Sequence, residues 1–229
     1  RRKSREKSEV PVVALVGYTN AGKSTLLNKL SGADVYVQDQ LFATLDAVSR
    51  RVETPTGMPF LLVDTVGFIR KLPHSLVSAF RSTLEEAALA YVLVIVSDGA
   101  SPDMEAQHRV VEEVLAELGA TEQPRIEAVN KCDLGGAVPP GAVRISAQTG
   151  EGLDRLMDEI ARQLQQTHAP VTLMIPFSRY GLLSQVRPLG QVLEEKHTDT
   201  GTELTLLLSS ADRDRLLSKY GAELFVTHR

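Results

Sequence analysis

Residues 17–24 read Gly-Tyr-Thr-Asn-Ala-Gly-Lys-Ser and match the pattern G-x-x-x-x-G-K-[ST]. The two glycines let the backbone turn its N–H groups toward a phosphate, at the positive end of the helix that follows. Lys23 then reaches the β- and γ-phosphates, and the Ser24 hydroxyl binds Mg²⁺. The pattern predicts a nucleoside triphosphate site formed by Gly17, Tyr18, Thr19, Asn20, Ala21, Gly22, Lys23, Ser24 and Thr25.

A second motif, Asn130-Lys131-Cys132-Asp133, indicates that the base is guanine. The Asp133 carboxylate can accept two hydrogen bonds, from the ring N–H and the exocyclic amine of guanine, a donor pair that adenine lacks. Lys131 would lay its stem along the base, and Asn130 would tie this loop to the phosphate loop. Ser146-Ala147 fits a last guanine loop, in which a backbone N–H meets the base carbonyl.

The sequence Asp64-Thr65-Val66-Gly67 supplies candidate groups for the metal and the γ-phosphate. Asp64 would hold Mg²⁺ through water, and the Gly67 N–H would contact the γ-phosphate. Thr44 is the candidate second hydroxyl on Mg²⁺, although spacing alone favours it no more than another loop threonine. The predicted metal ligands are therefore Ser24, Thr44 and Asp64, and the predicted catalytic residues are Lys23, Thr44, Gly67 and Asn20.

The residue that would orient the hydrolytic water is missing from its usual place. Many GTPases carry Gln directly after D-x-x-G, whereas this chain has Phe68, which cannot hydrogen-bond water. Asn20 offers two interpretations of equal weight: it holds a K⁺ ion beside the phosphates, or it serves the turn. We expect slow turnover by the chain alone, raised by K⁺ or by a partner.

Hydrophobic patterning predicts the elements that position these motifs. Short strands are expected at residues 12–16, 48–53, 60–63, 91–96, 126–129 and 143–145, and helices at 23–30, 76–89, 104–118 and 153–164. Residues 33–46 show no clear period and are expected to form a long loop. Alternating strands and helices favour an α/β fold: a P-loop, doubly wound, mostly parallel sheet, with the strand pair around residues 55–57 adding an antiparallel edge.

The rest of the chain predicts a small second domain. Residues 168–170 are interpreted as a linker, followed by a strand at 171–175, a helix at 180–196, a strand at 203–208 and a helix at 212–220. The expected organisation is a basic stub at 1–10, a nucleotide-binding G domain at 11–167 and a small C-terminal α/β domain at 168–229.

Composition excludes several other classes of protein. The 229 residues are 43% hydrophobic and 24% charged with a net charge of −4, as in a globular protein and unlike a disordered chain. The apolar run that contains residues 91–96 is far shorter than the about 20 residues of a membrane span. The one cysteine, Cys132, fits a reducing compartment. His108, His168, His197 and His228 show no metal-ligand spacing.

The start of the chain is Arg1, and residues 1–9 hold five basic and two acidic side chains. This segment is interpreted either as a solvated tail or as the cut end of a longer protein.

Four stretches together resemble the HflX family of ribosome-associated GTPases: residues 15–25, 41–46, 64–74 and 80–86. The resemblance implies that Phe42, Ala43 and Thr44 belong to the nucleotide site, with Thr44 as the Mg²⁺ ligand, and that Phe68 is the family's usual substitution for Gln. One departure is Ala47, where the family usually has Pro.

The same resemblance implies a cytoplasmic protein that binds GTP, GDP and Mg²⁺ and associates with the large ribosomal subunit. It implies splitting or rescue of stalled ribosomes under stress, and GTPase activity that ribosomes stimulate. The family's N-terminal domain would be missing, so this chain is expected to hydrolyse GTP but to be defective in splitting. No membrane span is expected, and a monomer is favoured.

Two other function classes remain open. The chain could be a nucleotide-dependent binding module with negligible turnover, in which Phe68 reflects lost catalysis. A P-loop ATPase or kinase is disfavoured by Asp133.

Overall fold

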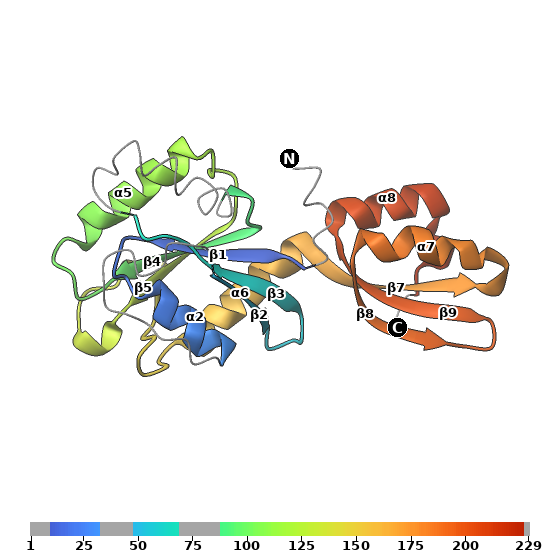
Figure 1. The fold of residues 1–229 in the computed structure, drawn as a ribbon, viewed down its shortest axis with the longest axis horizontal. Coiled ribbons are helices and arrows are strands. Elements are labelled where there is room, and N and C mark those ends of the chain that lie inside the picture. Colours follow the sequence, from blue (N-terminus) through green and yellow to red (C-terminus); the bar gives the residue numbers. More distant parts are fainter. Residues whose placement is uncertain (1–9, 33–47, 69–87, 227–229) are drawn as a thin grey trace. The chain divides into compact units, whose positions relative to one another are not determined.

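The computed structural model describes residues 10–32, 48–68 and 88–226 (Figure 1). The predicted loop at 33–46, which carries Phe42, Ala43 and Thr44, and nearly all of the predicted helix at 76–89 lie outside these residues. The contacts between residues divide the chain into two compact units. The larger unit is residues 12–163, and the smaller unit is residues 164–226 together with Val10 and Pro11.

The larger unit is built on a six-stranded sheet with the strand order β2-β3-β1-β4-β5-β6. Its neighbours pair in parallel except for the edge strand β2, which runs antiparallel to β3. The mostly parallel α/β fold with an antiparallel edge is therefore confirmed. The strands are β1 (Val12–Gly17), β2 (Val48–Glu53), β3 (Pro59–Asp64), β4 (Val92–Asp98), β5 (Arg125–Asn130) and β6 (Val143–Arg144).

Helices cover both faces of this sheet. In Figure 1, α5 (Met104–Glu117) lies on one side, and α2 (Lys23–Ser31) and α6 (Leu153–Thr167) lie on the other. The central strand β1 supplies both cores because alternate side chains point to opposite faces. Ala14 and Val16 of β1 pack with Val111 and Leu115 of α5. This burial on two faces explains why β1 is continuously apolar.

The smaller unit contains a three-stranded antiparallel sheet in the order β7-β9-β8. Its elements are β7 (His168–Pro176), η2 (Phe177–Leu182), α7 (Leu183–Val186), η3 (Arg187–Leu189), β8 (Gln191–His197), β9 (Gly201–Ser209), α8 (Ser210–Tyr220) and η4 (Ala222–Leu224). Leucines 204, 206 and 208 of β9 form a core with Leu183, Val186 and Leu216 from the helices.

Two predictions for this unit are wrong. The expected helix at 180–196 ends at Leu189, and residues 191–197 form the edge strand β8. Strand β8 exposes most of its side chains and has a register shift between Val192 and Glu194, so its sequence shows no two-residue alternation. The expected linker at 168–170 is the beginning of β7, where Pro170 lies on a sheet edge and needs no ladder N–H.

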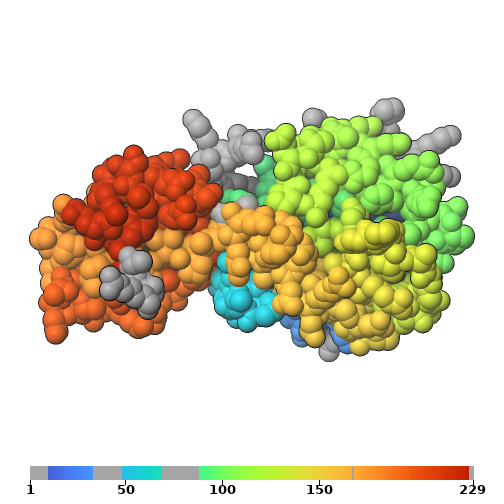
Figure 2. All heavy atoms as spheres, turned by 180° about the vertical axis from the view of Figure 1, so that it is seen from behind, coloured from blue at the N-terminus to red at the C-terminus, as the bar shows by residue number. Residues whose placement is uncertain are grey.

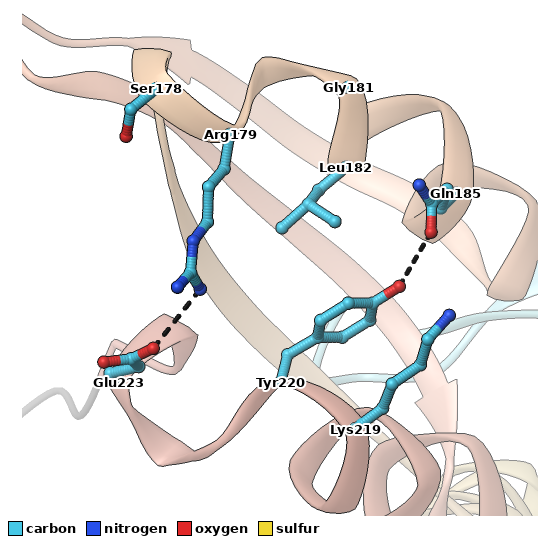
Figure 3. Close-up of a pocket in the computed structure, with 8 residues that line it drawn as sticks. All are labelled: Ser178, Arg179, Gly181, Leu182, Gln185, Lys219, Tyr220 and Glu223. Atoms are coloured by element: carbon cyan, nitrogen blue, oxygen red, sulfur yellow. Dashed lines mark hydrogen bonds and ion pairs between the residues drawn. The ribbon is translucent and has the colours of Figure 1, made fainter.

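A surface hollow of about 570 Å³ lies between the helical segments of the smaller unit (Figure 3). Two polar contacts cross it: Arg179 Nη1 lies 3.2 Å from Glu223 Oε1, and the Tyr220 hydroxyl donates to Gln185 Oε1 at 2.8 Å. These contacts pair four of the polar side chains that line the hollow. Among the described residues, no helix has the length and apolar character needed to cross a membrane.

Candidate functional site

The predicted motifs gather at one edge of the larger sheet. The phosphate loop follows β1, the Asp64–Gly67 segment follows β3, the Asn130–Asp133 motif follows β5, and Ser146-Ala147 comes two residues after β6. These four strands run parallel to one another, so their carboxyl ends meet at the same edge. Ligands of open α/β sheets bind outside that edge.

The phosphate loop depends on a glycine where it enters α2. Gly22 caps α2 with a φ of 93°, a conformation that side-chain-bearing residues rarely adopt. A Cβ atom at this position would lie 2.3 Å from Asn130 Nδ2. Gly22 therefore permits both the turn and the close approach of the guanine motif. Asn20 has a φ of 63°, so the turn itself favours Asn there.

Lys23 is buried and turned back onto its own loop. Its Nζ donates to the carbonyl oxygens of Gly17, at 3.2 Å, and Tyr18, at 3.1 Å. Burial lowers the pKa of Lys23 from 10.5 to about 8, and the nearby Asp64 carboxylate partly opposes that fall. A phosphate at the loop would replace these carbonyls as the partner of the ammonium group.

Ser24 and Asp64 form a pair of oxygen groups suited to Mg²⁺. The Ser24 hydroxyl donates to Asp64 Oδ2 at 2.5 Å, across 40 residues of sequence. Asp64 is only 1% exposed. A hydroxyl and a carboxylate at this separation are the hard oxygen ligands that Mg²⁺ requires, so the residues fit the predicted metal. The third predicted ligand, Thr44, lies outside the described residues.

The segment after Asp64 is hydrogen-bonded to the phosphate loop. The backbone N–H of Thr19 donates to the Phe68 carbonyl at 2.8 Å, and the Phe68 N–H donates to the Gly17 carbonyl at 3.1 Å. A Cβ atom on Gly67 would lie 2.7 Å from Thr19 Cα, so only glycine fits there. The Gly67 backbone thus reaches the phosphate loop.

The Phe68 side chain is part of the hydrophobic core. It is 1% exposed and packs in the cluster that contains Val16, Val66 and Leu93. Phe68 therefore cannot hydrogen-bond a water molecule, and its side chain is buried in the core. A hydrolytic water at this site would therefore have to be positioned by groups other than Phe68.

Asn130 joins three loops through its buried amide. Its Nδ2 donates to the Ala21 carbonyl of the phosphate loop at 2.8 Å, the connection that the sequence predicts. Its Oδ1 accepts the Ala147 N–H at 2.9 Å. The Ser146 N–H in turn donates to the Glu151 carbonyl. The Ala147 N–H already donates to Asn130 Oδ1. A guanine carbonyl that bound there would therefore share this N–H with Asn130.

Two side chains that the sequence analysis did not select hold the guanine motif. Asp98 Oδ2, at the end of β4, lies 2.7 Å from Lys131 Nζ. Arg144 Nη2 donates to the Cys132 carbonyl at 2.9 Å, and Arg144 Nε donates to Glu151 at 3.3 Å. Asp133 is exposed, next to these fixed groups. A sequence signal for Asp98 did exist. It is the acidic residue that ends the buried strand β4, and β4 pairs with β5, the strand that leads into the guanine motif.

Comparison with known proteins identifies the family. A protein-family model described as a 50S ribosome-binding GTPase matches residues 12–131, and a family model described as the HflX C-terminal domain matches residues 137–225. Curated proteins named GTPase HflX are similar over most of the chain. The chain belongs to the HflX family of GTPases. One relative, from Caldanaerobacter subterraneus subsp. tengcongensis, is 48% identical over 94% of this chain and 51% of its own length.

The chain spans about half the length of the HflX relatives it matches. The GTPase HflX of Escherichia coli is 40% identical over 88% of this chain and 50% of its own length. The HflX relative of Akkermansia muciniphila is 41% identical over 95% of this chain and 53% of its own length. These relatives agree in name and in the share of their length that this chain covers, about half.

Solved structures show the same GTPase fold. A GTP-binding protein from Sulfolobus solfataricus in complex with GDP is similar with a TM-score of 0.54 and 26% identity, over 71% of this chain and 55% of that chain. Era in complex with MgGDPNP and a segment of 16S ribosomal RNA is similar with a TM-score of 0.52 and 28% identity, over 68% of this chain and 57% of that chain. The P-loop GTPase fold of the larger unit of this HflX-family chain is thus confirmed.

Proposed function

We propose that this HflX-family chain is a GTP-binding and GTP-hydrolysing switch. The observation that carries the proposal is the Asn130 amide, which bonds the guanine motif to the phosphate loop and to Ala147. This arrangement joins base recognition to phosphate recognition in one site. Family membership supports hydrolysis as the reaction.

The proposed roles follow the positions of the residues. Residues 17–25 hold the phosphates with Lys23 as their cation, Asn130, Lys131, Asp133, Ser146 and Ala147 hold guanine, and Ser24 and Asp64 hold Mg²⁺. When bound, Mg²⁺ neutralises charge on the phosphate oxygens. Phe42, Ala43 and Thr44 keep the roles that the family resemblance implies. Gly67 donates its N–H to the γ-phosphate from a position against Thr19.

Hydrolysis by the isolated chain is proposed to be slow. The burial of Phe68 removes the usual water-orienting position from the site, which supports this view. We retain K⁺ beside Asn20 as one way to raise the rate, although the left-handed backbone of Asn20 explains that residue equally well. A partner that completes the site is the other way.

The proposed partner is the ribosome, through its large subunit, in the cytoplasm. The matched model is described as a 50S ribosome-binding GTPase, and the Era structure contains ribosomal RNA. Splitting or rescue of stalled ribosomes is proposed only for a form with the full length of the matched HflX relatives, of which this chain spans about half. We propose that the chain is a monomer. We place the boundary between its two domains at 167–168, close to the division between the two compact units at 163–164.

Multiple-turnover phosphate release tests this proposal. The chain is incubated with GTP, with and without purified 50S subunits, in K⁺ and in Na⁺ buffers, beside a version extended at its N-terminus. We expect slow release that 50S subunits raise at least about tenfold. Equal rates in K⁺ and Na⁺ would remove the potassium assignment. GTP binding with no release under any of these conditions would favour the alternative, a nucleotide-dependent binding module, which the buried Phe68 also fits.

A further inference from the structure

Three side chains with metal-binding atoms meet between α5 and β5, outside the nucleotide loops. His108 and Glu112 are four residues apart on α5 and therefore project from the same face of the helix. Glu127 comes from β5, and its Oε2 lies 3.6 Å from His108 Nδ1. One ligand atom from each residue lies within 4.8 Å of the others. The third ligand, Glu127, comes from β5, so the spacing of residues along α5 alone did not reveal this cluster.

Arg125 holds one of these ligands in place. Its Nη1 contacts Glu112 Oε2, and its Nη2 donates to the Ala120 carbonyl at 3.0 Å. This contact orients the Glu112 carboxylate and leaves its other oxygen for a further partner. Metal-binding carboxylates are commonly fixed in this way by a hydrogen-bond donor behind them.

The cluster has a surplus of partly buried negative charge. His108 and Glu127 are 34% and 38% exposed, and Glu112 is 35% exposed, so each is shielded but reachable from solvent. Burial raises the pKa of Glu127, and the Glu112 carboxylate raises it further, whereas His108 and Arg125 lower it. A bound cation would offset the repulsion between the two carboxylates.

We propose that His108, Glu112 and Glu127 bind one divalent transition-metal ion, with Zn²⁺ as the preferred case. One imidazole nitrogen and two carboxylate oxygens form a donor set that suits Zn²⁺ or Co²⁺ better than Mg²⁺, which prefers oxygen alone. Water fills the remaining coordination positions because all three residues reach solvent. Helix α5 lies in the green part of Figure 2 and forms part of the visible surface.

The site would join α5 to the strand that leads into the guanine motif. Glu127 precedes Asn130 by three residues on β5. A metal bridge between α5 and β5 stabilises the folded state because the unfolded chain holds no such site. The expected effect is a higher melting temperature in Zn²⁺, independent of whether the chain hydrolyses GTP.

The test measures binding of ZnCl₂ by calorimetry and of CoCl₂ by its visible absorption, with GDP and Mg²⁺ present to occupy the nucleotide site. The variants are His108→Gln and Glu127→Gln, which are close in size to the originals. The matched controls are Glu113→Gln, an exposed residue of the same helix, and His197→Gln, on β8. Circular dichroism and GDP binding check that every variant is folded.

We expect one equivalent of Zn²⁺ to bind the original chain and both controls. His108→Gln and Glu127→Gln should each weaken that binding at least about tenfold and abolish the Zn²⁺-dependent rise in melting temperature. Unchanged affinity in the folded His108→Gln and Glu127→Gln variants would overturn the proposal. So would the absence of saturable Zn²⁺ binding by the original chain.

Discussion

The two ends of the nucleotide site hold their polar groups in different ways. At the base end, residues 130–133 and 144–147, loops are bonded to one another through Asn130, Lys131 and Arg144. At the phosphate end, residues 17–24 and 64–68, Lys23 donates to carbonyls of its own loop and Ser24 donates to Asp64. The base-end contacts leave the Asp133 carboxylate exposed, whereas the phosphate-end contacts use the groups that phosphate and Mg²⁺ need.

This difference indicates where binding must change the protein. The base end can accept guanine with its loops already connected, which lowers the entropy lost on binding. The phosphate end must exchange internal hydrogen bonds for bonds to the ligand. A switch needs such an exchange, because a ligand shifts a conformation only through contacts that differ between the two states.

The largest expected effect is on the choice of base. Asp133→Asn removes the acceptor pair for guanine, so GDP affinity should fall by about 10⁴-fold, the size of effect seen when a site loses its matched hydrogen bonds. Competition binding with GDP, ADP and xanthosine diphosphate measures it. Xanthosine diphosphate should bind this variant more tightly than GDP does. ADP binding the original chain as tightly as GDP would contradict the guanine assignment.

The next effect concerns the connection between the two ends. Asn130→Ala leaves the Ala21 carbonyl and the Ala147 N–H without their side-chain partner, at about 1–3 kcal/mol for each buried group. The free energy of unfolding, from urea denaturation without nucleotide, should fall by about 2–6 kcal/mol. Asn130→Asp keeps the acceptor for Ala147 but places a buried carboxylate oxygen against the Ala21 carbonyl, so it should lose at least as much. An unchanged urea midpoint for Asn130→Ala would mean that nucleotide, not the free protein, connects the loops.

Lys23 gives the phosphate end a pH dependence. Its pKa in the free protein is about 8, and a bound phosphate favours the protonated form. Binding therefore takes up no proton well below pH 8, takes up a proton above it, and weakens by about tenfold for each pH unit above 8. Calorimetry of GDP binding in buffers of different ionisation enthalpy measures that uptake. Equal proton uptake on both sides of pH 8 would contradict the buried, internally bonded Lys23.

The smallest effect is expected at the rim of the base end. Arg144→Ala removes a donor to the Cys132 carbonyl, but Arg144 is exposed, so its contacts contribute little. GDP dissociation, followed with a fluorescent analogue, should become about twofold to fivefold faster. Arg162→Ala, which removes an exposed arginine–glutamate pair on α6, is the matched control and should leave the rate unchanged.

The fold of the larger unit was largely predictable because its signals are local. Buried parallel strands such as β1 and β4 are unbroken apolar runs, and glycines mark the ends of α2 and α5. Strand β8 was not predictable, because an exposed edge strand with a register shift has no periodic apolar face. Its Glu194-Glu195-Lys196 run also favours a helix.

The candidate site divides in the same way. The phosphate loop and the guanine motif are each one unbroken stretch of sequence. The type and order of their residues were therefore enough to find them. Asp98 was missed because it meets Lys131 only through the pairing of β4 with β5, where Asp98 lies opposite Asn130. The His108 cluster was missed because its third member, Glu127, comes from a strand. The burial of Phe68 in the core also required the fold, since sequence showed only that it replaces Gln.

Hydrogen exchange of backbone amides, in the free chain and with GDP and Mg²⁺, tests the contrast between the two ends most directly. We expect the amides of Cys132 and Ala147 to be already protected in the free chain and to change little, because both are hydrogen-bonded. Protection should change most at residues 17–24 and 64–68. The opposite result, with residues 130–133 and 144–147 unprotected until GDP binds, would contradict a base end that is connected before the nucleotide arrives.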